Sequence, residues 1–219
     1  MEQDLLFEEI GVPWLVDARW NVVEAPPSFR QSANGGNIVV SQGFSREWIE
    51  ERVAQLASAP QVGRRWLLEI AFGKACITRI ERVSADARTT PSQGDLFRVK
   101  FAPVISLNLT QPDALAKVHP CMHAHLGELA HLTRRELEVY RLLGKGASNG
   151  EVAKSVVRTT RLVESVTLRL RRGLGGDSLR TVIAHSAQSG LYCLADDHFA
   201  TILANHHPRK AQATKSKRA

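Results

Sequence analysis

The sequence predicts an α+β protein: an N-terminal domain with an antiparallel sheet and helices, followed by an all-α domain of four helices. Three observations lead to this prediction. Residues 96–105 alternate apolar and polar side chains, as a half-buried strand does. Residues 132–191 carry two helix-start signatures and apolar residues at helical spacing. With 219 residues, and 43% of them hydrophobic, the chain is long enough for a core in each domain.

The N-terminal domain, residues 5–107, is predicted to start with a hairpin. Residues 13–17 and 20–23 are short apolar runs on either side of a polar turn. The next segment, residues 44–56, repeats large apolar side chains at helical spacing, and Pro60 ends this helix. Three strands are expected after it, over residues 66–72, 75–83 and 96–105, with a turn-rich loop over residues 86–95.

This order of elements resembles a PAS domain, and the opening VPWLVDARWNVVEA is similar to the start of many such domains. The residues that a receiver domain or an acyl-homoserine-lactone domain would need are absent, so both are disfavoured. A PAS-like sheet can enclose a small molecule, hold haem or flavin, or only dimerise. The sequence has no flavin-attaching cysteine motif, and its tryptophans are more typical of a core than of a cofactor site. No cofactor is therefore predicted, while a small-molecule ligand and a partner protein both remain open for this domain.

Residues 108–127 are predicted to form a linker helix between the domains. Its apolar residues recur at spacings of three and four, which suits a helix in a dimer seam, although Pro120 should kink it. These residues are Leu115, Val118, Met122 and Leu126, and the same spacing continues to Leu129 just beyond the predicted helix. Four potential metal ligands lie in the same segment: His119, Cys121, His123 and His125. Their i, i+2 spacing scatters them around a helix, so no metal site is predicted.

The C-terminal helical domain, residues 128–193, contains clear helix starts. Thr133 is followed by Glu136, and Ser148 by Glu151, each pair just before an apolar run. These pairs are capping boxes, in which a hydroxyl and a carboxylate satisfy backbone N–H groups at the helix start. A third helix is expected after a turn of only a few residues, capped by Thr159 and running to about residue 173. A fourth helix, starting at residue 177 or 178, would brace the other three.

The third helix is predicted to be amphipathic. Val163, Val166 and Leu170 fall on one face and should be buried, while the opposite face is rich in arginine. A helix pair with a short turn and such a face is typical of a helix-turn-helix that meets phosphates and base edges of DNA. The candidate DNA-binding residues are Thr159, Thr160, Arg161, Glu164, Ser165, Thr167, Leu168, Arg169, Arg171 and Arg172. Glu164, Ser165 and Leu168 are expected to set sequence preference, and the arginines to set affinity.

Residues 132–191 resemble the LuxR/FixJ-type DNA-binding domain. The family pattern LT-x-RE-x-EV…LL-x-x-G-x-SN-x-E-[IV]-A…[ST]-x-x-x-V…G-L is matched without gaps. The matching residues are Leu132, Thr133, Arg135, Glu136, Glu138, Val139, Leu142, Leu143, Gly146, Ser148, Asn149, Glu151, Val152, Ala153, Thr159, Val163, Gly190 and Leu191. Four positions depart from the family. It usually has an apolar residue at Arg158, threonine at Leu162, histidine at Val166 and often lysine at Gly173.

The resemblance implies a bacterial transcriptional regulator that binds double-stranded DNA as a homodimer, with the N-terminal domain sensing a signal or mediating dimerisation. No enzymatic activity is predicted, because no catalytic triad or carboxylate pair stands out and GKGASNG lacks the spacing of a phosphate loop. The alternative is a degenerate family member that captures another transcription factor instead of DNA. Such a member would keep the helical core and lose the DNA-binding face, which would account for the departures at Leu162 and Val166.

The charge distribution suits a DNA-binding C-terminal half. Residues 132–219 hold 16 Lys and Arg against 7 Asp and Glu, whereas residues 1–131 hold 13 against 15. Residues 194–219 are expected to form a short helix and a basic disordered tail. The sequence contains no signal peptide pattern and no apolar run long enough for a membrane span, so a cytoplasmic protein is expected. Three widely spaced cysteines indicate no disulfide framework.

Overall fold

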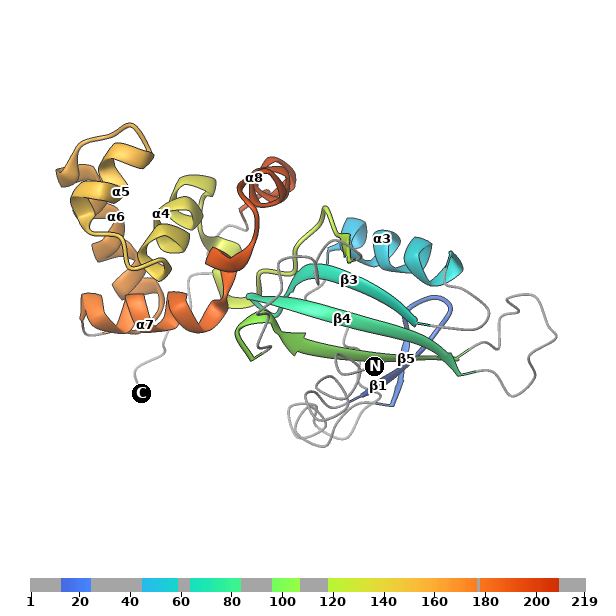
Figure 1. Ribbon diagram of the computed structural model, residues 1–219. Coiled ribbons are helices and arrows are strands. Elements are labelled where there is room, and N and C mark those ends of the chain that lie inside the picture. The colour runs from blue at the N-terminus through green and yellow to red at the C-terminus, as the bar shows by residue number, and fades with distance from the viewer. Residues whose placement is uncertain are drawn as a thin grey trace, which may run out of the picture.

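The computed structural model describes residues 13–24, 45–58, 64–83, 96–106, 118–176 and 178–208. A sheet with one long helix forms the N-terminal part, and a group of helices forms the C-terminal part beside it (Figure 1). The predictions for residues 5–12, for the loop at 86–95 and for the tail beyond residue 208 lie outside the described residues. None of the described helices combines the length and the apolar character that crossing a membrane requires.

Six strands form one mixed sheet with the order β2-β1-β5-β4-β3-β6. The strands are β1 (Trp14–Asp17), β2 (Val22–Glu24), β3 (Arg64–Ala71), β4 (Lys74–Val83), β5 (Leu96–Pro103) and β6 (His119–Pro120). Among the first five strands, every pair of neighbours in the sheet is antiparallel. These five include the predicted hairpin and the three predicted strands. Alternation in β5 holds only at its start, where Phe97 and Val99 are buried and Arg98 between them is exposed; Lys100, expected on the exposed face, is buried as well. Strand β6 runs parallel to β3 and so departs from the predicted antiparallel sheet.

Helix α3 (Arg46–Ala57) lies against one face of the sheet (Figure 1). Ser45 caps its N-terminus, where the Ser45 hydroxyl accepts the Trp48 N–H. Trp48 and Leu56 face the sheet and join its apolar cluster. The other buried members are Trp14, Val16, Trp20, Leu67, Ile80, Phe97, Val99 and Cys121. Three of the four tryptophans are therefore buried core residues of this part.

A charged cluster is buried beneath α3. Arg52 Nε donates to Glu69 Oε2 at 2.9 Å, and both side chains are fully buried. Arg52 also pairs with Glu51 at 2.7 Å, and the Glu51 carboxylate accepts the backbone N–H groups of Met122 and His123. Burial by itself raises the pKa of Glu51, but these N–H donors and Arg52 outweigh it and hold the pKa below its usual value of 4.5. The cluster thus links the sheet, α3 and the segment that leads to the helical part.

The predicted linker helix over residues 108–127 is wrong in its described part, residues 118–127. This segment forms β6 and then continues along the edge of β3. Cys121 and His125 donate their backbone N–H groups to carbonyl oxygens of β3, each at 2.9 Å. The open edge of β3 presents backbone groups that an extended segment satisfies and a helix would not. Pro120 suits an edge strand because it has no N–H to donate.

The apolar residues assigned to a dimer seam also have a different role. Leu126 and Leu129 are buried in a core that the sheet shares with the helices, and Val118 packs partly against it. Met122 is exposed, and Leu115 lies outside the described residues. The seam prediction is therefore wrong for Leu126 and Leu129, which join two parts of the same chain.

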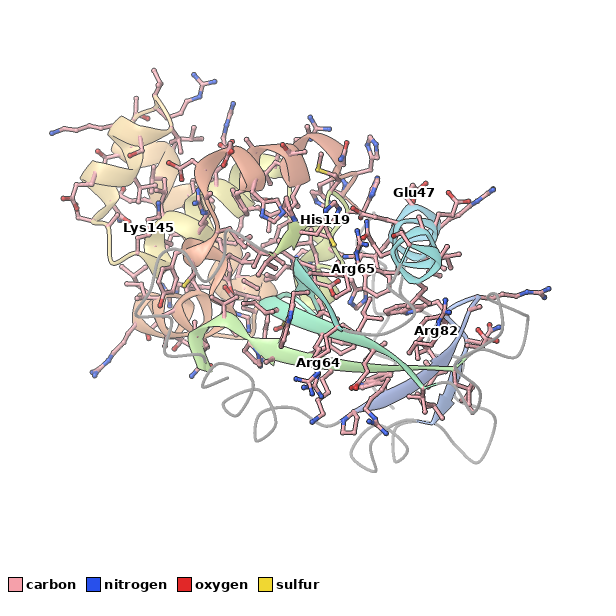
Figure 2. All side chains as sticks on the ribbon, turned by 45° about the vertical axis from the view of Figure 1, so that its right-hand side comes forward. Glu47, Arg64, Arg65, Arg82, His119 and Lys145 are labelled. Atoms are coloured by element: carbon pink, nitrogen blue, oxygen red, sulfur yellow. The ribbon has the colours of Figure 1, made fainter. Side chains whose placement is uncertain are left out.

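The histidines of this segment are engaged separately. His119 forms a hydrogen bond with a glutamine of α3 at 3.0 Å, and His123 Nδ1 lies 3.2 Å from a Glu51 oxygen. His125 Nδ1 accepts the Phe72 N–H at 3.1 Å. Residues 118–127 are called the joining segment below. Figure 2 labels His119 on this segment and Glu47 on the adjacent α3. Within the described ranges, no three His, Cys, Asp or Glu side chains are arranged to hold a metal ion.

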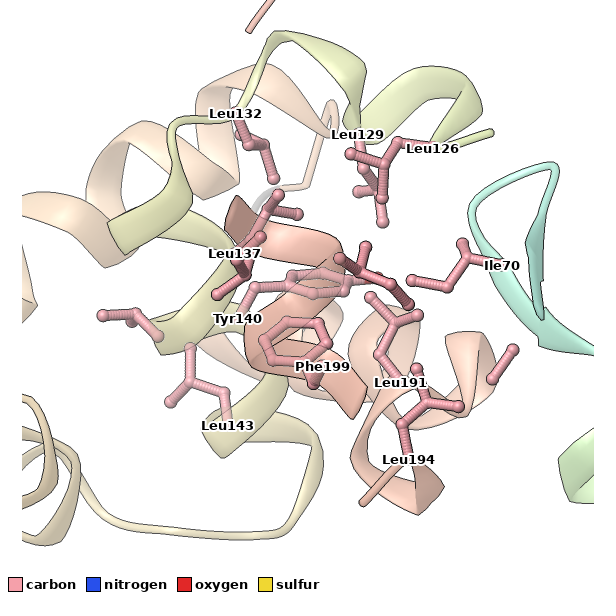
Figure 3. Close-up of a cluster of buried hydrophobic side chains, with 14 of the residues drawn as sticks. Ile70, Leu126, Leu129, Leu132, Leu137, Tyr140, Leu143, Leu191, Leu194 and Phe199 are labelled. Carbon is pink, nitrogen blue, oxygen red and sulfur yellow. The ribbon is translucent and has the colours of Figure 1, made fainter. Parts of the chain in front are cut away.

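The second apolar core spans both parts, whereas the sequence predicted one core for each domain. Figure 3 shows its centre, where Ile70 of β3 approaches residues of the helical part. The figure labels these members of the buried cluster: Ile70, Leu126, Leu129, Leu132, Leu137, Tyr140, Leu143, Leu191, Leu194 and Phe199. The predicted short helix is α8 (Asp196–Asn205), and it packs back over the joining segment. His198 Nε2 donates to Cys121 O at 2.8 Å, which helps to fix the helices against the sheet.

Candidate nucleic-acid interface

Four helices build the predicted helix-turn-helix region: α4 (Arg134–Gly144), α5 (Asn149–Ser155), α6 (Thr160–Gly173) and α7 (Leu179–Ser189). Both capping boxes are formed. The Thr133 hydroxyl accepts the Glu136 N–H at 3.3 Å, and the Glu136 carboxylate accepts the Thr133 N–H at 2.9 Å. Ser148 and Glu151 make the same pair of bonds at the start of α5. Local sequence therefore determines where α4 and α5 begin.

A short turn separates α5 from α6. Arg158 donates its N–H to Ala153 O at 2.9 Å, and Thr159 caps α6 by accepting the Leu162 N–H at 3.4 Å. Val157 lies between α5 and this cap with a positive φ of 51°. The Arg158 side chain, which occupies a position that is apolar in the family, is exposed. This position does not contribute a buried apolar contact between the two helices.

Helix α6 has the predicted buried face. Val163, Val166 and Leu170 are all buried against the other helices, so the valine at the family's histidine position is a core residue. Thr167 is also buried, with 6% of its surface exposed, and its prediction as a DNA-binding residue is wrong. The reason is its spacing, since Thr167 follows Val163 by four residues and precedes Leu170 by three.

The opposite face of α6 is exposed. The candidate residues with exposed side chains at its start and along it are Thr159, Thr160, Arg161, Glu164, Ser165, Leu168, Arg169 and Arg172. Leu168 is 43% exposed, an apolar side chain within a basic and polar surface. Arg171 is half-buried at the edge of this face. Guanidinium groups on such a face can bind phosphate oxygens, and hydroxyl and carboxylate groups can bond to base edges.

Arg169 of α6 forms an ion pair within the chain. Its Nε lies 2.7 Å from Glu136 Oε1, the carboxylate that also caps α4. Burial alone raises the pKa of Glu136, but the N–H and hydroxyl of Thr133 and the Arg169 guanidinium together hold it below its usual value. The sequence did not reveal this ion pair, since its partners are 33 residues apart. The pair fixes α6 against α4 and partly neutralises Arg169.

Helix α7 braces α4 from the other side. Ser178 caps α7 by accepting the Thr181 N–H at 3.2 Å, and the other predicted cap, Asp177, lies outside the described residues. Tyr140 of α4 forms a 2.6 Å hydrogen bond with His185 Nδ1. Burial raises the pKa of Tyr140 to about 12, so its hydroxyl stays protonated in this contact.

No known family and no curated protein matches the chain. Several solved structures are similar to it at low identity, among them the following three. A phage VqmA–DPO complex shares 16% identity over 91% of this chain and 94% of its own, with a TM-score of 0.38. A Vibrio cholerae VqmA–ligand–DNA complex shares 17% over 90% and 91%, with a TM-score of 0.31. A Vibrio cholerae VqmA dimer without target DNA shares 19% over 92% of each chain, with a TM-score of 0.31. Because identities and TM-scores are low, these similarities by themselves assign no function to this chain.

Proposed function

We propose that this chain is a transcriptional regulator that binds double-stranded DNA through α6. The observation that carries the proposal is the exposed face of α6, which bears arginine, hydroxyl and apolar side chains while the other face is fixed in the core. Arg161 and Arg172 supply phosphate contacts. Glu164, Ser165 and Leu168 lie between them and read base edges in the major groove. The motif resemblance of this region to LuxR/FixJ-type domains agrees with the proposal.

For the N-terminal part we propose a PAS-like domain that senses a signal or mediates dimerisation. The hairpin, the helix α3 and three long strands follow one another in the order that the sequence resemblance implies. Neither the identity of a small-molecule ligand nor that of a partner protein is part of this proposal. In this proposal, the sheet and α3 control how the attached helices are presented to DNA.

We further propose that the regulator acts as a homodimer. One helix-turn-helix contacts only a few base pairs, so two copies reading half-sites about one helical turn apart supply the affinity that a regulator needs. Selection of duplexes from a random pool with the purified chain tests this directly. Enrichment of a two-fold symmetric site is the expected result. Failure to enrich any site, together with capture of another transcription factor, would favour the alternative function.

Removing Arg161 or Arg172 is expected to weaken the salt dependence of DNA binding. Each Arg→Ala change removes one phosphate contact and should lower the magnitude of the slope of log K against log salt by about 0.9. Arg169→Ala is the matched control, because Glu136 already partly neutralises Arg169 and a smaller change in slope is expected. Fluorescence anisotropy with the selected duplex over a range of salt concentrations measures all three. Identical slopes for the three variants would contradict the assignment of phosphate contacts to Arg161 and Arg172.

Leu168→Ala is expected to reduce sequence preference. An apolar side chain on the groove-facing surface can pack on a thymine methyl group, so the change should cost about 1–3 kcal/mol on the selected site and much less on random duplex. Leu179→Ala on α7, where the leucine is similarly exposed, should leave both affinities unchanged. If Leu168→Ala lowers the two affinities equally, Leu168 does not read bases.

A further inference from the structure

Val157, in the turn between α5 and α6, combines two features that are unusual for valine. Its side chain is 78% exposed, more than any other large apolar side chain of the described residues. Its φ of 51° lies in the left-handed region, where a β-branched side chain is strained. Glycine or asparagine would relieve that strain, and an exposed valine gains nothing from the core. Strained residues of this kind concentrate at functional sites, which makes the surroundings of Val157 a candidate contact surface.

Val157 lies in a shallow surface hollow, here named the turn hollow. It is lined by Ala153, Lys154, Val157, Arg158 and Thr159. Lys154 and Arg158 are both exposed, and the lining contains no acidic side chain. The acidic residue of α5, Glu151, is occupied by the cap, where its carboxylate accepts the Ser148 N–H at 2.8 Å and the Ser148 hydroxyl at 2.7 Å. The turn hollow is therefore lined by two exposed cations together with one large, exposed apolar side chain.

We infer that the turn hollow receives the sugar–phosphate backbone of one DNA strand. A DNA strand alternates anionic phosphates with less polar deoxyribose rings, and the turn hollow combines two cations with an apolar side chain. Lys154 and Arg158 bind phosphates, and Val157 packs against a deoxyribose between them. This inference rests on the proposed function of α6.

The position of the turn hollow favours DNA over an acidic protein partner. Thr159 lines the hollow and also caps α6, so the hollow lies directly beside the start of the helix that enters the groove. When the first turn of a recognition helix lies in the major groove, the residues just before it face the strand that forms the wall of the groove. Contacts there position the protein without reading sequence.

The decisive variant is Val157→Asn, because it should change stability and binding in opposite directions. Asparagine tolerates the left-handed conformation, so the midpoint of thermal unfolding should rise by about 2–4 °C. Loss of the apolar contact should weaken DNA binding about fivefold, equally on the selected site and on random duplex. Lys154→Ala and Arg158→Ala should each reduce the magnitude of the salt slope by about 0.9. Val23→Asn and Lys74→Ala, at exposed positions of the sheet, serve as controls and should leave binding unchanged.

Binding by these variants distinguishes a failure of this inference from a failure of the proposed function. Full affinity of Val157→Asn, Lys154→Ala and Arg158→Ala, with weakened binding by Arg161→Ala, would overturn the inference and leave α6 as the DNA-binding element. Loss of binding to an acidic protein with full DNA affinity would also overturn it. If the unaltered chain binds no duplex at any salt concentration, both the proposed function and this inference fail. Weaker binding by a more stable Val157→Asn variant is the result that supports the inference.

Discussion

Arg52→Ala is expected to lower the free energy of unfolding by about 3–5 kcal/mol, because it leaves the buried Glu69 carboxylate without its cation. Glu69 would keep the hydroxyl of Thr78 as a hydrogen-bond donor, but a neutral donor does not replace a guanidinium at zero exposure. The loss should reach the helical part as well, because Arg52 also pairs with Glu51, which holds the joining segment. Urea denaturation followed by circular dichroism measures the change.

Two further variants test the cause of that loss. Arg46→Ala breaks an ion pair with Glu50 on the exposed side of the same helix and should leave stability nearly unchanged, since both partners are in water. Combining Arg52→Ala with Glu69→Gln removes the uncompensated buried charge and should recover part of the stability. If the double variant is no more stable than Arg52→Ala, the isolated carboxylate is not the source of the effect.

Leu129→Ala is expected to cost about 2–5 kcal/mol and to weaken both parts of the molecule together. Leu129 is completely buried in the core that the sheet shares with the helices, so its removal leaves a cavity between them (Figure 3). All four tryptophans lie in the sheet part, so their fluorescence reports on the sheet while far-ultraviolet circular dichroism is dominated by the helices. Both signals should shift to lower urea concentration by the same amount.

The matched control for Leu129→Ala is Met122→Ala. Met122 belongs to the joining segment that leads to Leu129, but its side chain is exposed, and its change to alanine should leave both unfolding curves in place. A fluorescence midpoint that stays constant in Leu129→Ala while the helical signal shifts would show that the two parts unfold independently. The idea that the sheet fixes the orientation of the DNA-binding helices would then be wrong.

Elements whose causes lie within a few residues were predictable from the sequence. The capping boxes at Thr133 and Ser148 specify the starts of α4 and α5 through bonds that span three positions. The helical spacing of Val163, Val166 and Leu170 identifies the buried face of α6, whereas the alternation in β5 identifies the buried face only as far as Val99, because Lys100 is buried as well. The exposed face of α6 follows from the same spacing.

Three features of the candidate site were not predicted, and they have different origins. The burial of Thr167 could have been read from its spacing to Val163 and Leu170, so the signal was present in the sequence. The engagement of Arg169 by Glu136 could not, because no local rule connects residues 33 positions apart. The left-handed conformation of Val157 was equally hidden, since valine is not a residue that indicates such a turn.

The sequence by itself determined the starts of α4, α5 and α6 and the basic face of α6, because each depends on residues that are near neighbours in the chain. Tertiary structure alone decided the path of residues 118–127 and the pairing of Arg52 with Glu69. The apolar spacing of that segment reports a local helical preference, which is weak. The backbone bonds to the edge of β3 and the burial of Leu126 and Leu129 outweigh it. Those partners come together only when the sheet and the helices have packed.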